Sequence, residues 1–457
     1  MPYVVFLGGF DGLTWGRASR LDRAAELIAT FGVAVIVLTL PLEFTAKFLD
    51  QQLSRFVILV VLVAFGYLVV KRRRTLVIPR FASVWLLLVL VIVSILSWLV
   101  TRAPGSTNTL LDIALYPFVG LLIANLVVTR EDHRRAWIAF IVSGLAVAAL
   151  GAVLYLAHAQ IWAPNPAVAH RVNITFADPN ITARFLTLCA CAAVLLFAAR
   201  KSPPWLAFAA AVACAVVLPL TFSRSGLALF ILMVALMVPL AFNRRRAAAI
   251  AVVALIAFGL STGLNPDTRQ RAADATMTMA DFVTGTHHAT SSTPAIDNGI
   301  ALEDNRVFLV AAGVKMFTDH PFLGVGYGGY QHALLTTYRR FLPTGYTDSV
   351  SHTSVITVLA EQGVVGALLL FAFLLQLARE AWAARRRKDD WAVWSTISAA
   401  MVVPIFLYSQ FEGRLLQEPY LWLALGLFYG AQQIALRQTI TVRAEPAARA
   451  RSSVEAA

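Results

Sequence analysis

The chain has 457 residues, of which 59% are hydrophobic and only 14% are charged. Soluble domains average about 45–50% apolar and about 25% charged residues. The mean hydropathy here is +0.71, so the composition excludes an ordinary soluble protein and predicts a polytopic membrane protein. The net charge of +13 does not indicate nucleic-acid binding, because most basic residues form short clusters between apolar segments.

The sequence indicates neither a protein stabilised by disulfides or zinc nor a cleaved signal peptide. The three cysteines lie inside apolar segments, so we expect neither a disulfide framework nor a zinc site. The first residues, MPYVVFLGGFDGLTWGR, lack a basic region ahead of their short apolar run. We therefore do not interpret them as a cleaved signal peptide.

Apolar segments long enough to span a membrane recur along the whole chain. A spanning helix needs roughly 20 mostly apolar residues. This criterion predicts an all-α fold with about 12 transmembrane helices, at approximately 24–41, 53–70, 81–100, 110–128, 136–157, 180–199, 204–221, 226–242, 247–264, 353–378, 391–411 and 419–437.

The basic clusters predict how these helices are oriented. Cytoplasmic loops carry an excess of Lys and Arg, and most of the 38 basic residues fall on one side if the N-terminus is cytoplasmic. This orientation divides the chain into four parts. Spans one to nine occupy 1–264, and a large, partly helical extracytoplasmic loop occupies 265–352. Spans ten to twelve occupy 353–437, and a disordered cytoplasmic tail follows at 438–457. Within the loop, 283–300 looks flexible and has no assigned role.

The first outer segment with polar candidates is AHRVNITFADPNITARF, residues 169–185. Asp178 and Asn180 fit a turn and helix cap before span six. Arg171 is an outer cation. Arg184 lies about a turn into the span, where a charge is costly in lipid, so we expect it to face the protein interior.

The next segment, PLTFSRSGLALF, places Arg224 in a very short outer turn between spans seven and eight. Ser223 and Ser225 are suitable caps for the following helix. An arginine at a helix N-terminus opposes the helix dipole, which suggests a functional reason for its position. The alternative is that Arg224 extends to lipid phosphates.

Residues 303–330, EDNRVFLVAAGVKMFTDHPFLGVGYGGY, predict a helix capped by Asp304 or Asn305 and followed by a glycine-rich turn. Arg306 then lies in the first helical turn, again against the dipole. It could instead be solvated or paired with Glu303. The glycines match G-x-G-x-x-G, but that motif binds dinucleotides only between a strand and a helix. We expect a tight turn whose backbone approaches a partner closely.

His352 lies in the stretch GYTDSVSHTSVITVLAEQGVVG, before span ten. Ser349 or Ser351 could cap this span, which would leave His352 in or beside its first turn. The positive helix end disfavours the imidazolium, so a neutral ring could accept a proton.

A glycine pattern within the span bears on where that ring points. Gly363 and Gly366 fall on nearly the same helical stripe as His352. We expect the stripe to pack against another helix and to turn His352 toward the protein. Glu361 lies on the opposite side, so we expect it to have a structural role instead of pairing with His352.

Arginines and one neutral histidine on the outer face suit a particular chemistry. Arginine binds phosphate oxygens bidentately, and histidine can take a proton from an attacking hydroxyl. Together they could displace a diphosphate and stabilise its developing charge. There is no D-x-D, paired-histidine or cysteine-cluster motif, so we expect neither a metal ion nor a cofactor.

The ordered set TFSRSG, DNRVFLVAAGVKMFTDHPFLGVGYGGY and SHTSVITVLAEQGVVG resembles the O-antigen ligase and O-antigen polymerase superfamily. The resemblance implies a fold of about a dozen helices with a periplasmic loop domain, similar to other lipid-dependent (GT-C-like) glycosyltransferases. Its ligases transfer a glycan from undecaprenyl diphosphate to lipid A core at the periplasmic face of the bacterial inner membrane, without metal or nucleotide.

The resemblance also implies residue roles. Arg224 and Arg306 match the arginines that hold the carrier diphosphate, and His352 matches the histidine that activates the acceptor hydroxyl. Further candidates for substrate contact are Arg171, Arg339, Arg340, Asn180 and Arg184. A polymerase that extends a growing glycan, or an enzyme that transfers glycan to protein, would use the same donor. A transporter or flippase is disfavoured because its substrate site would lie near the midplane.

Overall fold

The computed structural model describes most of the chain. The described ranges are 19–49, 52–102, 107–161, 171–270, 272–273, 305–342, 351–413 and 415–455. Within them the structure consists of helices and connecting segments, without strands. The flexible stretch predicted at 283–300 lies outside these ranges.

Twelve long helices in the described ranges lie at the positions of the predicted spans. They are α1 (Arg20–Thr39), α3 (Leu53–Val70), α4 (Ala82–Thr101), α5 (Thr107–Leu126), α6 (Arg130–Leu156), α7 (Pro179–Ala199), α8 (Pro204–Val217), α9 (Arg224–Leu240), α10 (Arg244–Leu264), α14 (Ser354–Arg385), α15 (Asp390–Glu412) and α16 (Pro419–Glu455). Nine helical segments of the described chain are long and apolar enough to cross a membrane, α8 together with the 3₁₀ turn η3 (Leu218–Thr221) among them, whereas α9 is apolar but shorter. The all-α polytopic fold is therefore confirmed.

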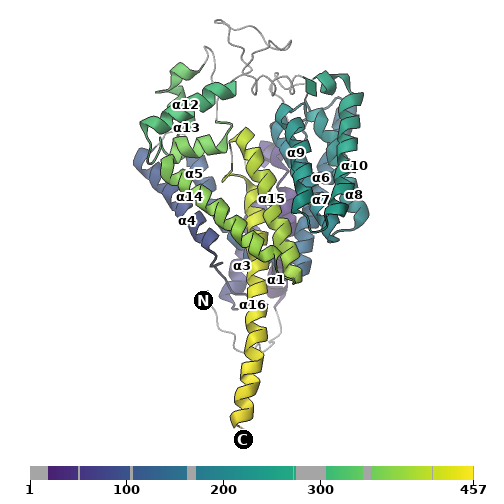
Figure 1. Ribbon diagram of the computed structural model, residues 1–457, viewed down its shortest axis with the longest axis vertical. Coiled ribbons are helices and arrows are strands. Elements are labelled where there is room, and N and C mark those ends of the chain that lie inside the picture. Colours follow the sequence, from purple (N-terminus) through teal and green to yellow (C-terminus); the bar gives the residue numbers. More distant parts are fainter. Residues whose placement is uncertain are drawn as a thin grey trace.

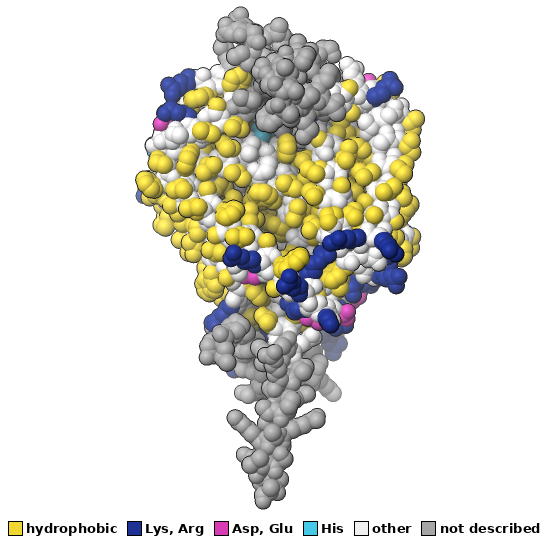
Figure 2. Space-filling view, in the orientation of Figure 1, with side chains coloured by type: hydrophobic (Ala, Val, Ile, Leu, Met, Phe, Trp, Pro, Cys, Tyr) yellow, Lys and Arg dark blue, Asp and Glu magenta, His cyan; other side chains and the backbone are white. Residues whose placement is uncertain are grey.

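The helices surround α16, which lies along the long axis of the molecule (Figure 1). On one side are α4, α5 and α14, and at their end lie the shorter helices α12 (Asn305–Asp319) and α13 (Tyr330–Leu335). On the other side are α6 to α10. Figure 2 shows a broad apolar band around the middle, with Lys and Arg gathered toward the two ends. This is the surface expected of a protein embedded in a bilayer.

The last helix differs from the prediction. We expected a disordered tail from residue 438, but α16 continues to Glu455. Starting a helix is the costly step, and adding residues to an existing one is much cheaper. The spanning part of α16 supplies that existing helix, so a polar continuation needs no nucleus of its own.

The predicted loop helix and glycine-rich turn are both present. Asn305 begins α12, and Asp304, the other capping candidate, lies outside the described ranges. After α12 the chain turns through Gly324, Gly326 and Gly328, which have φ values of +67°, +101° and +72°. Glycine adopts these conformations without the strain that a Cβ would cause.

The turn packs into a break in α14. At Gly363 the backbone leaves the helical region, with φ +64° and ψ −160°. The carbonyl oxygens of Ala360 and Glu361 accept hydrogen bonds from Val325 N (2.8 Å) and Gly326 N (3.1 Å). The turn therefore bonds to carbonyl groups that a continuous helix would satisfy internally.

Further contacts fix the same break. Val364 N donates to Pro321 O at 2.7 Å, just beyond Gly363. A Cβ on Gly363 would overlap the carbonyl of Phe322, and a Cβ on Gly324 would lie 2.6 Å from the backbone nitrogen of Gln362. The expected close approach of the turn to a partner is thus present, and the partner is the backbone of α14.

The break corrects the glycine-stripe prediction. The angular spacing from His352 to Gly363 and Gly366 assumed an uninterrupted helix, and the helix is interrupted at Gly363. Gly363 contacts the turn, and a Cβ on Gly366 would overlap the side chain of Gln362 in its own helix. The two glycines therefore do not form a common helix-packing stripe.

Candidate functional site

Arg224 is the first residue of α9 and is partly buried. As predicted, Ser223 is the N-cap, and its Oγ accepts a hydrogen bond from Gly226 N at 3.1 Å. This bond satisfies one of the free N–H groups at the helix start. It also fixes the backbone from which the Arg224 side chain leaves.

Two predicted substrate residues support this turn. Ser223 Oγ donates to Asn180 Oδ1 at 2.7 Å, and Arg171 Nη2 donates to the same oxygen at 3.0 Å. Arg171 Nε also donates to Thr221 O at 2.9 Å. The predicted cap is confirmed as well, because Asp178 accepts from Asn180 N at 2.7 Å. Arg171 and Asn180 thus connect the start of α7 to the turn before Arg224.

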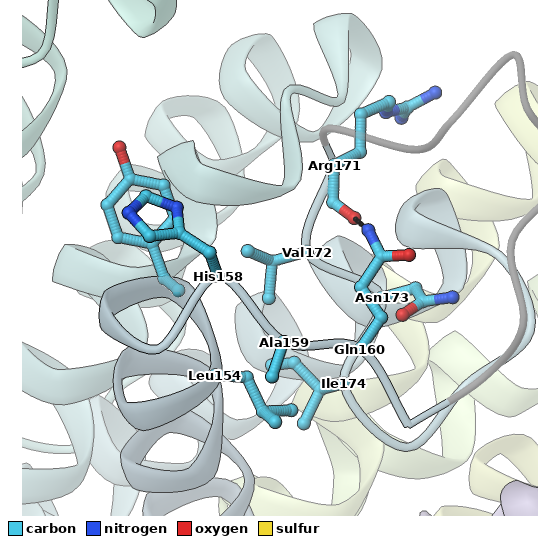
Figure 3. Close-up of a pocket in the computed structure, with 9 residues that line it drawn as sticks. Leu154, His158, Ala159, Gln160, Arg171, Val172, Asn173 and Ile174 are labelled. Carbon is cyan, nitrogen blue, oxygen red and sulfur yellow. Dashed lines mark hydrogen bonds between the residues drawn. The ribbon is translucent and has the colours of Figure 1, made fainter.

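A small pocket adjoins Arg171 at the C-terminal end of α6. The end of the helix bundle where α12 and α13 lie is here termed the outer end (Figure 1). It has a volume of about 330 Å³ and is lined by residues of 154–160 and 171–174. Figure 3 shows the hydrogen bond that joins the two segments, from Gln160 Nε2 to Arg171 O at 3.4 Å. This contact holds the Arg171 segment against α6.

Arg184 lies one helical turn below Asn180 on α7 and is only 6% exposed. It faces the protein interior, as expected. Its guanidinium pairs with Glu418, at 2.9 Å between Nη2 and Oε2, and with Glu412. Two of its nitrogens are thus committed to carboxylates, as a buried charge requires. Contact between Arg184 and substrate stays a prediction.

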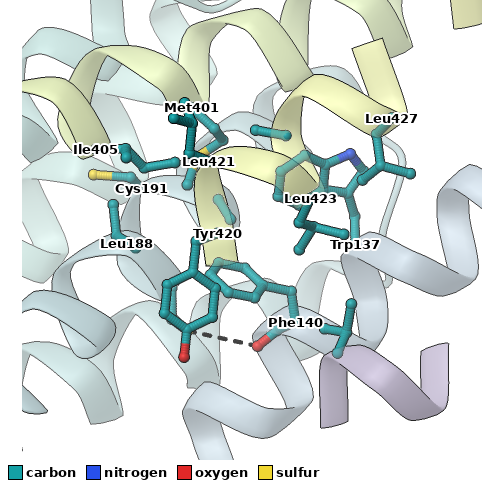
Figure 4. Close-up of a cluster of buried hydrophobic side chains, with 14 of the residues drawn as sticks. Trp137, Phe140, Leu188, Cys191, Met401, Ile405, Tyr420, Leu421, Leu423 and Leu427 are labelled. Atoms are coloured by element: carbon teal, nitrogen blue, oxygen red, sulfur yellow. Dashed lines mark hydrogen bonds between the residues drawn. The ribbon is translucent and has the colours of Figure 1, made fainter. Parts of the chain in front are cut away.

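Glu412 and Glu418 were missed from the sequence. They end α15 and precede α16, in the outer connection SQFEGRLLQEPY. The available signal was Arg184 itself, because an intramembrane cation needs an anionic partner. Below the ion pairs the interior is apolar, with Tyr420, Phe140, Leu188 and Cys191 drawn together from three helices (Figure 4).

His352 precedes α14, for which Thr353 is the N-cap residue. Ser351 is not the cap, but its Oγ accepts from Thr353 N at 3.3 Å and so shapes the segment around His352. The other capping candidate, Ser349, lies outside the described residues. His352 is partly buried and lies beside the first turn, as expected.

The segment holding His352 rests on the end of α15. Gly413, the C-cap of α15, has φ +72°. A Cβ there would overlap the carbonyl oxygen of Ser351 and would lie 3.4 Å from the Cα of His352. The backbone of His352 can therefore occupy this position only while residue 413 lacks a side chain.

Gly413→Ala is expected to displace His352 and to lower activity about tenfold or more, because misplacing a reactive group by about 1 Å can cost 10²-fold. The chain should still insert and fold. Turnover of the purified protein and its thermal unfolding measure the two effects. Gly259→Ala is the matched control, since nothing lies within 4 Å of its added Cβ. Equal activity of both variants would refute this dependence.

A polar cavity of about 400 Å³ lies beside this segment. Ser351, Gly413, Arg184 and Glu361 line it, together with residues at the outer ends of α3 and α5 and in the glycine-rich turn. The cavity therefore collects side chains from both sides of the bundle at the end where α12 and α13 lie.

Glu361 has the structural role expected of it. Its carboxylate accepts hydrogen bonds from Gly328 N at 2.9 Å and Tyr330 N at 3.1 Å, the latter at the start of α13. Tyr327, in the same turn, accepts a hydrogen bond from Gln417 Nε2 at 3.1 Å. Burial, with the nearby Glu361 carboxylate, raises the pKa of Tyr327 well above its usual value and keeps its hydroxyl protonated.

The other predicted arginines belong to the outer segment. Arg306 lies in the first turn of α12, which packs on α14 through Gly313 opposite Ile356. Its side chain is outside the described set. Arg339 and Arg340 are exposed in the short turn after α13. They do not line the 400 Å³ cavity.

No group of three His, Cys, Asp or Glu side chains that could hold a metal ion occurs in the part of the chain that the structure describes. The cysteines are buried within α7 and α8. That the reaction needs neither metal nor cofactor stays a prediction from the sequence.

Comparison with known proteins gives one family. Residues 209–371 match the family model for O-antigen ligase, and no curated protein matches the chain. The matched region contains Arg224, Arg306 and His352, whereas Arg171 and Asn180 precede it. The match and the helical membrane fold support a ligase- or polymerase-like enzyme that acts on lipid-linked glycans. The chain is thus a multi-pass membrane protein in which residues 209–371 are similar to the O-antigen ligase family.

Proposed function

We propose that the protein is an inverting glycosyltransferase that transfers a glycan from undecaprenyl diphosphate to an acceptor hydroxyl of lipid A core. The reaction would take place at the periplasmic face of the bacterial inner membrane. One observation carries the proposal: Arg224 and His352, both within the region matched to the family, adjoin segments that are connected to each other by contacts through the ends of α7 and α15.

This arrangement can be followed through contacts. Ser223, next to Arg224, bonds to Asn180 at the start of α7. One turn deeper, Arg184 pairs with Glu412 at the end of α15. The next residue, Gly413, contacts the backbone of Ser351 and His352. We infer that a substrate lying over these helix ends would be within reach of both Arg224 and His352.

The chemistry follows from these groups. The imidazole of His352 takes the proton of the acceptor hydroxyl while that oxygen attacks the anomeric carbon of the donor sugar. The bond between that carbon and the diphosphate oxygen breaks, and the diphosphate leaves with the bonding electrons. Arg224 and Arg306 hold its oxygens and stabilise the developing negative charge. A single displacement of this kind inverts the anomeric centre.

The direct test uses protein purified in detergent, labelled undecaprenyl-diphosphate glycan and lipid A core. Label transferred to lipid A core supports the ligase. Lengthening of the carrier-linked glycan would instead identify a polymerase, and label on protein would identify a protein glycosyltransferase. If no glycan changes carrier in detergent while labelled donor crosses reconstituted vesicles, the protein is a transporter.

A deletion strain provides an independent test. Loss of a ligase should cause long carrier-linked glycans to accumulate, because polymerisation continues without transfer. Accumulation of single repeat units would contradict the ligase and support the polymerase.

A further inference from the structure

The 400 Å³ cavity beside His352 has an unusual wall for an enzyme with an anionic donor. Its described lining includes five carboxylate side chains and two arginines. The carboxylates come from Glu43, Asp112, Glu361, Glu412 and Glu418. A volume in this range is sufficient to hold a small polar ligand.

Hydrogen-bonding capacity favours one kind of ligand. Asp112 pairs with Arg55, Glu412 and Glu418 pair with Arg184, and Glu361 accepts two backbone N–H groups. Each carboxylate has more acceptor sites than these contacts use and, when ionised, donates no hydrogen bond. The wall therefore still suits a ligand rich in hydroxyl or ammonium donors. A carboxylate or phosphate on the ligand would bring further acceptors and negative charge into a partly desolvated space, which is costly.

Other atoms of the wall also point to a polar ligand. Arg184 lines the cavity and is 6% exposed, and its Nε has no hydrogen-bond partner in the described part of the chain. Gln52 and Gln417 add amide donors and acceptors, and Tyr116 and Tyr420 add aromatic rings.

We propose that this cavity binds a sugar ring that carries hydroxyl or amino groups and no acidic group, and that its carboxylates exclude acidic sugars. The inference rests on the proposed function, since it assigns part of the glycan to that site. Ser351 and Gly413 line the cavity and adjoin His352, so a ring bound here lies next to the base. The diphosphate lies outside, toward Arg224, which is not among the lining residues.

The sugar could belong to the donor or to the acceptor, and both sources share this chemistry. The full-length protein in detergent is titrated by calorimetry with three soluble tetrasaccharides: maltotetraose, its amino-sugar counterpart from chitosan, and tetragalacturonate. The first two should bind, and tetragalacturonate should bind at least about tenfold more weakly, which corresponds to about 1.4 kcal/mol.

A charge variant tests whether the carboxylates cause this preference. Asp112 lines the cavity, 3.6 Å from the Arg55 guanidinium. Asp112→Asn removes one negative charge and should reduce the discrimination against tetragalacturonate severalfold. Asp267→Asn, which removes an exposed carboxylate from the short helical segment after α10, is the control and should leave the discrimination unchanged.

The proposal would be overturned if tetragalacturonate bound as tightly as maltotetraose, or if Asp112→Asn left the discrimination unchanged. It would also be overturned if no tetrasaccharide bound and the protein transferred neutral and acidic donor glycans equally well. Discrimination seen only among lipid-linked donors would assign the ring to the donor. If glycan is transferred without discrimination between neutral and acidic sugars, the sugar-binding role of the cavity is refuted and the proposed function stands. If neutral and acidic sugars are discriminated but no glycan is transferred, the proposed function is refuted and the sugar-binding role of the cavity stands.

Discussion

His352→Ala is expected to lower the rate of glycan transfer by about 10²–10⁴-fold, the usual contribution of a general base. The variant should still insert, fold and bind the lipid-linked donor, because His352 precedes α14 and is only partly buried. The measurements are single-turnover transfer in detergent, donor binding by the same preparation, and thermal unfolding.

His332→Ala is the matched control for this prediction. His332 is an exposed histidine of α13 in the same outer segment, and its removal should leave the transfer rate unchanged. If His352→Ala transferred glycan at the normal rate, the assignment of His352 as the base would be wrong. If it lost donor binding in parallel with transfer, His352 would be a binding residue.

Arg224→Ala is expected to weaken binding of the diphosphate donor by about 10–100-fold. A hydrogen bond to a charged group contributes about 1.5–3 kcal/mol, and 1.4 kcal/mol is a factor of ten in affinity. The turn itself should persist, because Ser223 caps the helix through its own side chain. Titration with donor and, separately, with inorganic diphosphate measures the change.

Two further variants sharpen this test. Arg224→Lys keeps the charge but loses the bidentate guanidinium, so its affinity should fall between wild type and Arg224→Ala. Arg245→Ala removes an exposed arginine from the first turn of α10, at the other end of the bundle, and should bind donor normally. Unchanged donor affinity in Arg224→Ala would remove this arginine from the site.

The helix positions could be predicted because hydropathy and capping are local properties. The observed α3 coincides with the predicted span 53–70, and Ser223 and Asp178 cap helices as their types and positions indicated. Burial of Arg184 also followed from the cost of charge in lipid. Each of these predictions depends only on a short stretch of sequence and on whether water or lipid surrounds it.

The contacts that organise the site could not be predicted in this way. The break at Gly363 is stabilised by residues 321–326, and Arg184 is paired with residues far along the chain. A helical projection assumes regular geometry, so it could not reveal that Gly363 belongs to a non-helical backbone. The partner of a buried charge is set by tertiary packing. The sequence shows that a buried arginine needs an anionic partner, but it does not show which residue that partner is.

The docking of the glycine-rich turn into α14 also has a practical consequence for the outer segment. Its small core includes Leu309, Met316 and Tyr330 but also Ala360 of α14, and Ser97 of α4 donates to Leu323 O at 2.9 Å. A soluble fragment spanning α12 and α13 would lack these partners and would expose their binding surface to water. Biochemical study of the outer segment therefore requires the intact membrane protein, because α4 and α14 supply part of the core and the hydrogen bonds of this segment.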